Sequence, residues 1–280
     1  METRRIPARR TTRHLQADVD LHFASATPLK CGVSWRGERM EVIHLDFQPT
    51  TVAWIGSLQS RLHQSSSSEL QRRYSRWEEV GLGELALAVA TRLAICIRVQ
   101  QNLCQSLENL RREAEAWDKL DEGVEGPFCF RPRDLRQLFD ICAAVDALFF
   151  EFRSVYEVLK KFATKFSRRI LGKQFSEAEL LKALQARGNT EWVELIRENR
   201  NLFFHQTAPW IALQVHQRRP LSCSLLVMKE NIKQFDDPSK YITEAQLAAA
   251  VEGVQEAAPA VRSWLERQLF EVEAELASAS

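Results

Sequence analysis

Apolar residues alternate near the N-terminus and recur at threes and fours along the rest of the chain. Five of them lie at near-alternating positions around an Arg-Gly-Glu turn at residues 36–38: Val33, Trp35, Met40, Val42 and Phe47. Alternation is typical of half-buried strands, so we predict a β-hairpin here, and the pattern allows a third strand around residues 18–23. Residues 51–63 are expected to form a short helix.

From residue 68 onward the apolar spacing is helical. We predict two long helices, over residues 68–120 and 131–172, with Gly81 and Gly83 dividing the start of the first. Nine apolar residues form one broad face of the second: Leu138, Ile141, Val145, Leu148, Phe149, Phe152, Val155, Leu159 and Phe162. Two long helices joined by a short loop are expected to pack antiparallel.

The last third of the chain is predicted to hold three more helices and a second hairpin. A capping box that begins at Ser176 starts a helix over residues 176–187. A second short helix is expected over residues 191–205. Residues 211–215 and 221–228 are predicted to pair as a hairpin, and a last helix follows over residues 243–277.

The predicted fold is therefore mainly α, an antiparallel bundle of long helices with a small β-containing N-terminal region. We divide the chain into a flexible basic arm (residues 1–14), the β-containing region (15–64) and the helical domain (65–280).

Composition narrows the possible functions only a little. Apolar residues make up 45% of the chain and charged residues 27%, with a formal net charge of +1. Nucleic-acid binding is therefore not indicated by overall charge, although a local basic cleft remains compatible with it. The six cysteines form no CxxC pair, so we expect reduced thiols and no metal site. No apolar run has the length of a bilayer or of a secretory signal, and we expect a cytoplasmic protein with no membrane partner.

One segment of the predicted 191–205 helix carries a chemically specific pattern. Residues 200–205 read Arg-Asn-Leu-Phe-Phe-His. This order resembles the signature of the HEPN superfamily, in which an arginine, often followed by a polar residue, precedes a histidine by a few positions. Arg200, Asn201 and His205 match those three positions. The resemblance covers about residue 68 to the C-terminus and implies a HEPN-like helical domain.

The resemblance also implies a function. Many HEPN proteins are metal-independent endoribonucleases of the toxin or antiviral-defence type that act as dimers. By this resemblance the chain is expected to cleave RNA as a homodimer without a cofactor, and an antitoxin or regulatory protein is a possible partner. His205 would exchange a proton with the ribose 2′-OH or the leaving 5′-oxygen. Arg200 would hold the scissile phosphate and Asn201 would orient it.

Helical geometry limits how these residues can meet. At about 100° per residue, Asn201 and His205 lie one turn apart on one stripe, with Arg197 a further turn back. Arg200 lies about 140° from His205 on a straight helix. The helix must therefore loosen at its end, the Arg200 side chain must wrap around it, or a partner subunit must supply one of the two residues.

Basic residues at the end of the second long helix are candidates for RNA contact. The cluster comprises Lys160, Lys161, Lys165, Arg168 and Arg169, and Arg197 joins it as a further candidate. Cations at a helix C-terminus also suit the helix dipole, so a solvated helix end is the alternative explanation.

Structural explanations of the motif stand beside the functional one. His205 can cap a helix end, and Arg200 can pair with Glu151 or Glu157 of the second long helix. The aromatic face of that helix is expected to be core or dimer interface: Phe149, Phe150, Phe152 and Tyr156. Three hypotheses follow: an active endoribonuclease, a noncatalytic RNA- or nucleotide-binding module, and a helical interaction protein.

Overall fold

The computed structural model describes most of the chain from residue 53 onward and three short segments before it. The described residues are 13–16, 30–36, 39–45, 53–115, 128–130, 135–188, 190–199, 210–217, 222–229, 232 and 235–278. Within them the chain is mostly helical, as the apolar spacing predicts, with two small antiparallel sheets.

The N-terminal sheet contains the predicted hairpin. Strands β2 (Lys30–Arg36) and β3 (Arg39–Leu45) pair antiparallel, with Trp35 opposite Met40, which confirms the hairpin. The third strand, β1 (Arg13–Gln16), pairs with β2 and comes before the position that the sequence suggested. Residues 18–23 and 1–12 lie outside the described residues. The last two residues of the predicted flexible arm therefore belong to a strand.

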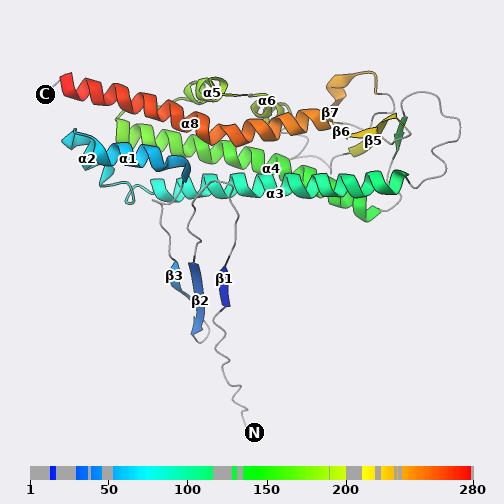
Figure 1. Cartoon of the computed structure of the whole chain (residues 1–280), viewed down its shortest axis with the longest axis horizontal. Coiled ribbons are helices and arrows are strands. Elements are labelled where there is room, and N and C mark those ends of the chain that lie inside the picture. Colours follow the sequence, from blue (N-terminus) through cyan, green and yellow to red (C-terminus); the bar gives the residue numbers. More distant parts are fainter. Residues whose placement is uncertain are drawn as a thin grey trace, which may run out of the picture.

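Three long helices form the body of the molecule. Helices α3 (Leu82–Glu115), α4 (Leu135–Phe166) and α8 (Glu244–Ser278) lie side by side, and α4 runs antiparallel to α3 and in the same sense as α8 (Figure 1). Their facing apolar residues are buried in one continuous core. The antiparallel arrangement of the two long helices is confirmed. None of the described helices is long and apolar enough to cross a membrane.

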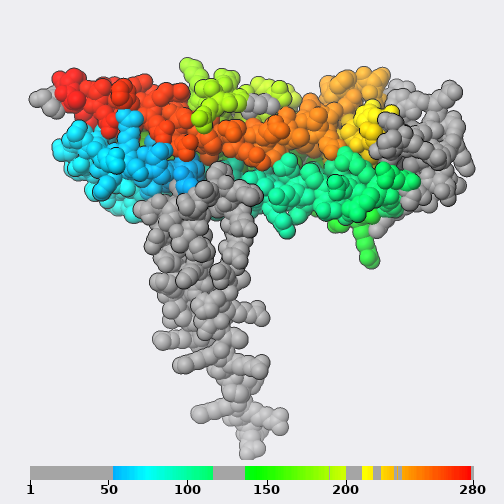
Figure 2. Space-filling view, in the orientation of Figure 1, coloured from blue at the N-terminus to red at the C-terminus, as the bar shows by residue number. Residues whose placement is uncertain are grey.

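The core also includes residues that precede Ser65. A 3₁₀ turn, η2 (Ala53–Ile55), leads into α1 (Gly56–Gln64), which is the short helix predicted over residues 51–63. Trp54 is buried and its Nε1 donates to the carbonyl oxygen of Ala86 at 2.9 Å. Arg61 pairs with Glu273 at 2.8 Å, and α1 and α2 lie beside the C-terminal part of α8 (Figure 2). Residues 53–64 thus pack with the helical domain.

The first predicted long helix is divided as Gly81 suggested. Helix α2 (Ser68–Tyr74) is capped by Ser67, because the Ser67 hydroxyl accepts from the amide of Leu70. A turn follows, in which Gly81 has a φ of 62°. Helix α3 then runs to Glu115, and residues 116–127 lie outside the described residues.

Helix α4 ends in a wider turn. Residues Ser167–Leu171 form a π-helical turn, η4, and Gly172 closes it with a φ of 73°, near the stop that the sequence predicted. Single π-turns at helix ends often accompany functional sites, because they alter the direction of the side chains.

Two short helices, α5 (Glu177–Gln185) and α6 (Glu191–Glu198), lie against α8. The capping box at Ser176 and Glu179 is present, as predicted. Helix α6 ends at Glu198, whereas the sequence predicted helix up to residue 205. Asn199 is its C-cap, and residues 200–209 lie outside the described residues.

The second sheet has the order β4-β5-β6-β7. Its centre is the predicted hairpin of β5 (Trp210–Gln217) and β6 (Ser222–Met228), which is confirmed. Strands β4 (Phe128–Phe130) and β7 (Tyr241–Thr243) add edges that the sequence analysis missed. Short 3₁₀ turn η5 (Pro238–Lys240) precedes β7. The predicted last helix, over residues 243–277, corresponds to α8.

Candidate functional site

The three motif residues, Arg200, Asn201 and His205, lie outside the described residues. Their mutual geometry therefore stays a prediction. The chain is described up to Asn199, which directly precedes Arg200. Asn199 is buried, and its side-chain amide donates to the carbonyl oxygen of Leu195 at 2.9 Å. This contact fixes the end of α6 at the point where the motif begins.

One of the two carboxylates suggested as structural partners of Arg200 is bound elsewhere. Glu151 is buried on α4 and pairs with Arg92 of α3 at 2.9 Å. Its burial raises the pKa of Glu151, and the Arg92 guanidinium partly opposes that rise. Glu157 is exposed and lines a hollow between basic side chains.

The predicted basic cluster lines a hollow at the end of α4. We call it the lysine hollow. It has a volume of about 470 Å³, and its basic lining residues are Lys160, Lys161, Lys165, Arg168 and Arg169. Leu85 of α3 and Glu157 contribute to the wall. The structure thus brings together five of the six residues that the sequence analysis proposed for RNA contact.

A second, smaller hollow adjoins the first and shares Arg168 and Arg169 with it. We call it the arginine hollow. It has a volume of about 230 Å³, and its remaining basic side chains are Arg72 and Arg73 of α2 and Arg76 of the turn that follows α2. These three arginines were not among the residues predicted from the sequence. Their closeness in the sequence was visible, but the packing of α2 against η4, which brings them to Arg168 and Arg169, was not.

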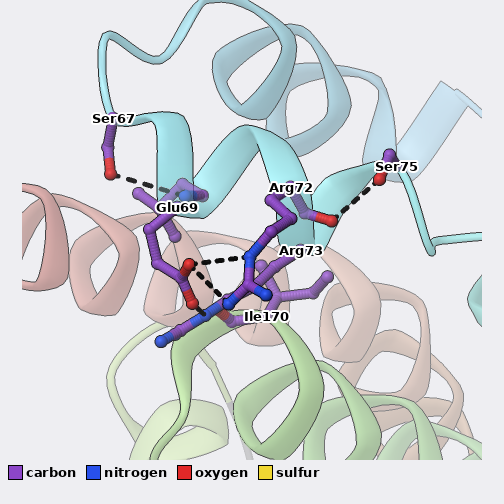
Figure 3. A network of polar contacts seen from close by, with 7 residues as sticks. Ser67, Glu69, Arg72, Arg73, Ser75 and Ile170 are labelled. Atoms are coloured by element: carbon purple, nitrogen blue, oxygen red, sulfur yellow. Dashed lines mark hydrogen bonds and ion pairs between the residues drawn. The ribbon is translucent and has the colours of Figure 1, made fainter.

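Glu69 and Glu79 bind Arg72, Arg73 and Arg76 and leave part of each arginine side chain exposed. Glu69 accepts from Arg72 Nε at 2.9 Å and from Arg73 Nε at 2.8 Å, and Arg73 Nη1 also donates to the carbonyl oxygen of Ile170 at 3.0 Å (Figure 3). Hydrogen bonds from Arg73 and Arg72 lower the pKa of Glu69. Arg76 binds Glu79 through Nε and Nη2, both at 2.9 Å.

The π-helical turn brings its two arginines to both hollows. Gly172 ends this turn in a left-handed conformation, and a Cβ atom at that position would lie 2.9 Å from Arg73 Nη1. The backbone angle therefore favours glycine, whereas the guanidinium is the far end of a flexible side chain that can move away from an added Cβ atom. Arg73 of α2 contacts this turn directly, through its hydrogen bond to the carbonyl oxygen of Ile170.

Four cations of this surface have no ion-pair partner among the residues that the structure describes. Throughout the part of the chain that the structure describes, no ion pair involves the following residues: Lys161, Lys165, Arg168 and Arg169. Arg169 does lie close enough to Glu79 to contribute to the lowered pKa of that carboxyl, after the larger effect of Arg76. We call these four residues the open group.

The other two predicted RNA-contact residues, Lys160 and Arg197, share one carboxylate. Glu177, the first residue of α5, accepts from Lys160 Nζ, Tyr156 Oη and Arg197 Nη2, each at 2.7 Å. These hydrogen bonds, from Lys160 first, lower the pKa of Glu177 to about 2. Burial, followed by the bond to Glu177, raises the pKa of Tyr156 to about 12. We call Glu177, Lys160, Arg197 and Tyr156 the paired group.

The aromatic residues of α4 are mostly core. Phe149, Phe152 and Tyr156 are buried, as expected, whereas Phe150 is 51% exposed with the Arg92 guanidinium 5.8 Å from its ring centre. Phe139, eleven residues earlier on the same helix, is 63% exposed. Phe139 and Phe150 are thus two separate exposed aromatic side chains on α4.

Among the described residues, His216 and two buried cysteines also carry side chains that can take part in chemistry. His216 of β5 shares a 2.7 Å hydrogen bond with the Ser224 hydroxyl of β6, which explains it as a cross-strand contact. Among the described cysteines, Cys96 and Cys223 are buried and free. The described ranges contain no group of His, Cys, Asp and Glu that could hold a metal ion. Comparison of the chain with protein-family models, curated proteins and solved structures gives no match.

Proposed function

We propose that this protein binds single-stranded RNA across the lysine hollow and cleaves it without a metal, as a HEPN-like endoribonuclease. The open group is the observation that carries the binding part of the proposal. Four cations with no ion-pair partner among the described residues converge on two adjoining hollows at one helix end. Such cations gain from an external polyanion, because RNA phosphates replace only water and counterions around them.

The paired group supports a link between this surface and the motif. Glu177 binds Lys160, which lines the lysine hollow, and Arg197, which lies three residues before Arg200. The end of α6 is thereby tied to the rim of the hollow. RNA in the lysine hollow would lie near the point at which the motif segment leaves α6.

The proposed reaction needs only the motif and the RNA. His205 removes the proton from a ribose 2′-OH, and the oxygen attacks the adjacent phosphorus. The bond between phosphorus and the 5′-oxygen breaks, and the leaving oxygen receives the proton that His205 has taken, directly or through water. The products are a 2′,3′-cyclic phosphate and a 5′-hydroxyl end, and His205 is neutral again. Arg200 stabilises the additional charge on the phosphate, and Asn201 orients it.

A homodimer would resolve the wide angle between Arg200 and His205 by bringing two motifs to one cleft. A contact with a second copy through α4 would cover the exposed Phe139 and Phe150. If the protein acts as a toxin, an antitoxin or regulatory protein is expected as a second partner, and the proposed place of action is the cytoplasm.

The first test is cleavage of a mixed-sequence RNA in EDTA by the wild type and by the His205→Ala variant. The proposal expects cleavage by the wild type alone, with cyclic-phosphate ends. A Lys161→Gln/Lys165→Gln double variant should cleave more slowly at low RNA concentration and normally at saturation, because it weakens binding only. Cleavage by the His205→Ala variant at the wild-type rate would exclude the proposed chemistry.

The noncatalytic RNA-binding module is the second candidate, and the same open group favours it. It predicts RNA binding that the double variant weakens, no cleavage, and no growth arrest on overexpression. Binding to anionic lipid vesicles in place of RNA would reject both candidates and assign the basic surface to a membrane.

A further inference from the structure

The arginine hollow differs in chemistry from the lysine hollow beside it. Five of its seven lining residues are arginines, and Glu69 is the one carboxylate among the seven. A lysine ammonium acts as a compact point charge, which suits the single charge of a bridging phosphodiester. A guanidinium has a planar fork of donors, which suits the several free oxygens of a terminal phosphate. The two hollows are therefore suited to different parts of one ligand.

Hydrogen bonds already position the side chains of Arg72, Arg73 and Arg76 at the arginine hollow. Glu69, Glu79 and the Ile170 carbonyl fix three guanidiniums, yet they use only some of the five donors that each carries. Arg73 is the most enclosed, with its side chain 27% exposed, whereas that of Arg72 is 75% exposed. Side chains that are already ordered lose less conformational entropy on binding, so this arrangement favours a compact and highly charged group.

The charges around the hollow leave a net positive site. Glu69 and Glu79 together offset two of the five arginines, and Arg168 and Arg169 bring no ion-pair partner of their own from the described residues. The hollow, at about 230 Å³, has room for a short phosphate chain but not for a nucleotide as well. A nucleotide attached to that phosphate chain would have to extend out of the arginine hollow. Arg168 and Arg169 line both hollows, so the nucleotide would extend past them toward the lysine hollow.

We propose that the arginine hollow binds a terminal phosphate or short phosphate chain, as found at the 5′ end of an RNA whose backbone follows the lysine hollow. This inference rests on the proposed RNA binding for its source of phosphate. It adds a specificity to that function: the protein prefers 5′-phosphorylated ends over 5′-hydroxyl ends. The same chemistry is offered by a free polyphosphate, which the experiment separates.

The test compares one RNA sequence with three 5′ ends: hydroxyl, monophosphate and triphosphate. A fluorescent label at the 3′ end reports binding to the His205→Ala protein, which keeps the RNA intact. The wild-type surface should bind the triphosphate RNA about 10-fold more tightly than the hydroxyl RNA, since several charge-assisted hydrogen bonds are gained. Inorganic tripolyphosphate should compete for that preference.

Two double variants test the contributions of the two hollows separately. Arg72→Gln/Arg76→Gln should remove the preference for phosphorylated ends and change the affinity for hydroxyl RNA by less than about 3-fold, because the lysine hollow is intact. Lys161→Gln/Lys165→Gln should weaken the binding of all three RNAs by the same factor and keep the preference for phosphorylated ends. Thermal unfolding of each variant identifies a folding defect, and Arg72→Lys/Arg76→Lys, which retains the charge but not the fork, should also lose the preference.

The outcomes distinguish this inference from the function on which it rests. Equal affinity for the three RNAs in the wild type would overturn the inference and leave RNA binding standing. Tight binding of tripolyphosphate, abolished by Arg72→Gln/Arg76→Gln, without binding of any RNA would overturn the proposed function and assign the hollow to a free polyphosphate. A preference that survives Arg72→Gln/Arg76→Gln would place the phosphate elsewhere and overturn the inference.

Discussion

Lys160 and Lys161 are neighbours in the sequence, yet they belong to two groups of cations that differ in what surrounds them. Lys160 shares Glu177 with Arg197 and Tyr156 in the paired group. Lys161 belongs to the open group, which has no ion-pair partner among the described residues. A helical step of about 100° turns one lysine toward α5 and leaves the other directed at the lysine hollow alone.

The difference shows that the ability to bind an external anion depends on packing rather than on residue type. A cation that a carboxylate already holds has fewer free donors and less uncompensated charge to offer a phosphate. A cation without a carboxylate gains from the phosphate directly, and the strength of that gain falls with salt. The open group should therefore dominate RNA binding, and the paired group should contribute only when Glu177 is removed.

The largest expected effect is the loss of the open group. The fourfold variant Lys161→Gln, Lys165→Gln, Arg168→Gln and Arg169→Gln should bind single-stranded RNA on the order of 100-fold more weakly at moderate salt. The slope of log affinity against log salt should fall in magnitude by about 3, since each phosphate contact on a single strand contributes about 0.7. Fluorescence anisotropy at several salt concentrations measures both quantities.

The control for the fourfold variant has the same change in net charge on other parts of the surface. It replaces four exposed arginines with glutamine: Arg98, Arg112, Arg187 and Arg267. If the control lost as much affinity as the fourfold variant, net charge rather than the hollow would govern binding, and the comparison between the two groups would fail.

A smaller effect is expected at the backbone turn that supports the arginine hollow. Gly172→Ala should lower the free energy of unfolding by about 1–2 kcal/mol, because alanine resists a φ of 73°. Gly56→Ala is the matched control, since a Cβ there has nothing within 4 Å. Urea unfolding measures both. Equal stability of the two variants would show that the turn adjusts freely and that Arg73 is not held by it.

The affinity for RNA is expected to rise when the Glu177 charge is removed from the paired group. Glu177→Gln removes the charge that holds Lys160 and Arg197, so both become available to RNA, and the affinity should rise by about 2- to 5-fold. Glu108→Gln, an equal charge change on an exposed part of α3, is the control. An unchanged affinity in Glu177→Gln alongside an intact fold would mean that Lys160 and Arg197 lie away from the path of the RNA.

The sequence predicted most of the helical fold because its signals are local. Apolar spacing located the long helices, Ser176 and Glu179 located α5, and the turn at residues 36–38 located the first hairpin. Helix α6 ends seven residues before the predicted end, at Glu198, because apolar spacing alone does not specify a terminus. The short edge strands β4 and β7 were missed because three residues carry too little pattern.

The candidate site was predicted only in part because its important contacts are long-range. The basic residues of α4 were found because they are close in sequence. Arg73 meets Ile170 across 97 positions, so its role depends on the packing of α2 against η4. Glu177 binds Lys160 across 17 positions and Arg197 across 20, from a different helix. A cluster of cations read from sequence thus gives candidates, and the packing decides which of them are free.

The smallest expected effect is a pH-dependent difference in stability between the wild type and Glu177→Gln. Hydrogen bonds from Lys160, Tyr156 and Arg197 lower the pKa of Glu177 from 4.5 to about 2 in the folded state. A carboxyl with a lowered pKa stabilises the fold above its unfolded pKa, and this contribution is lost as the pH falls from about 4.5 toward 2. Because the Glu177 side chain is 43% exposed, solvent screening limits the contribution to under about 1 kcal/mol.

Urea unfolding of the two proteins between pH 6 and pH 2 isolates this contribution. Glu69 and Glu79 also have lowered pKa values, but they are present in both proteins, so their effect cancels in the difference. The wild type should be the more stable at pH 6, and the difference should shrink toward zero near pH 2, when Glu177 becomes protonated. A difference that stays constant down to pH 2 would mean that the neutral carboxyl serves as well as the carboxylate. In that case Lys160 and Arg197 are held by geometry rather than by charge, and the distinction between the paired and open groups loses its electrostatic basis.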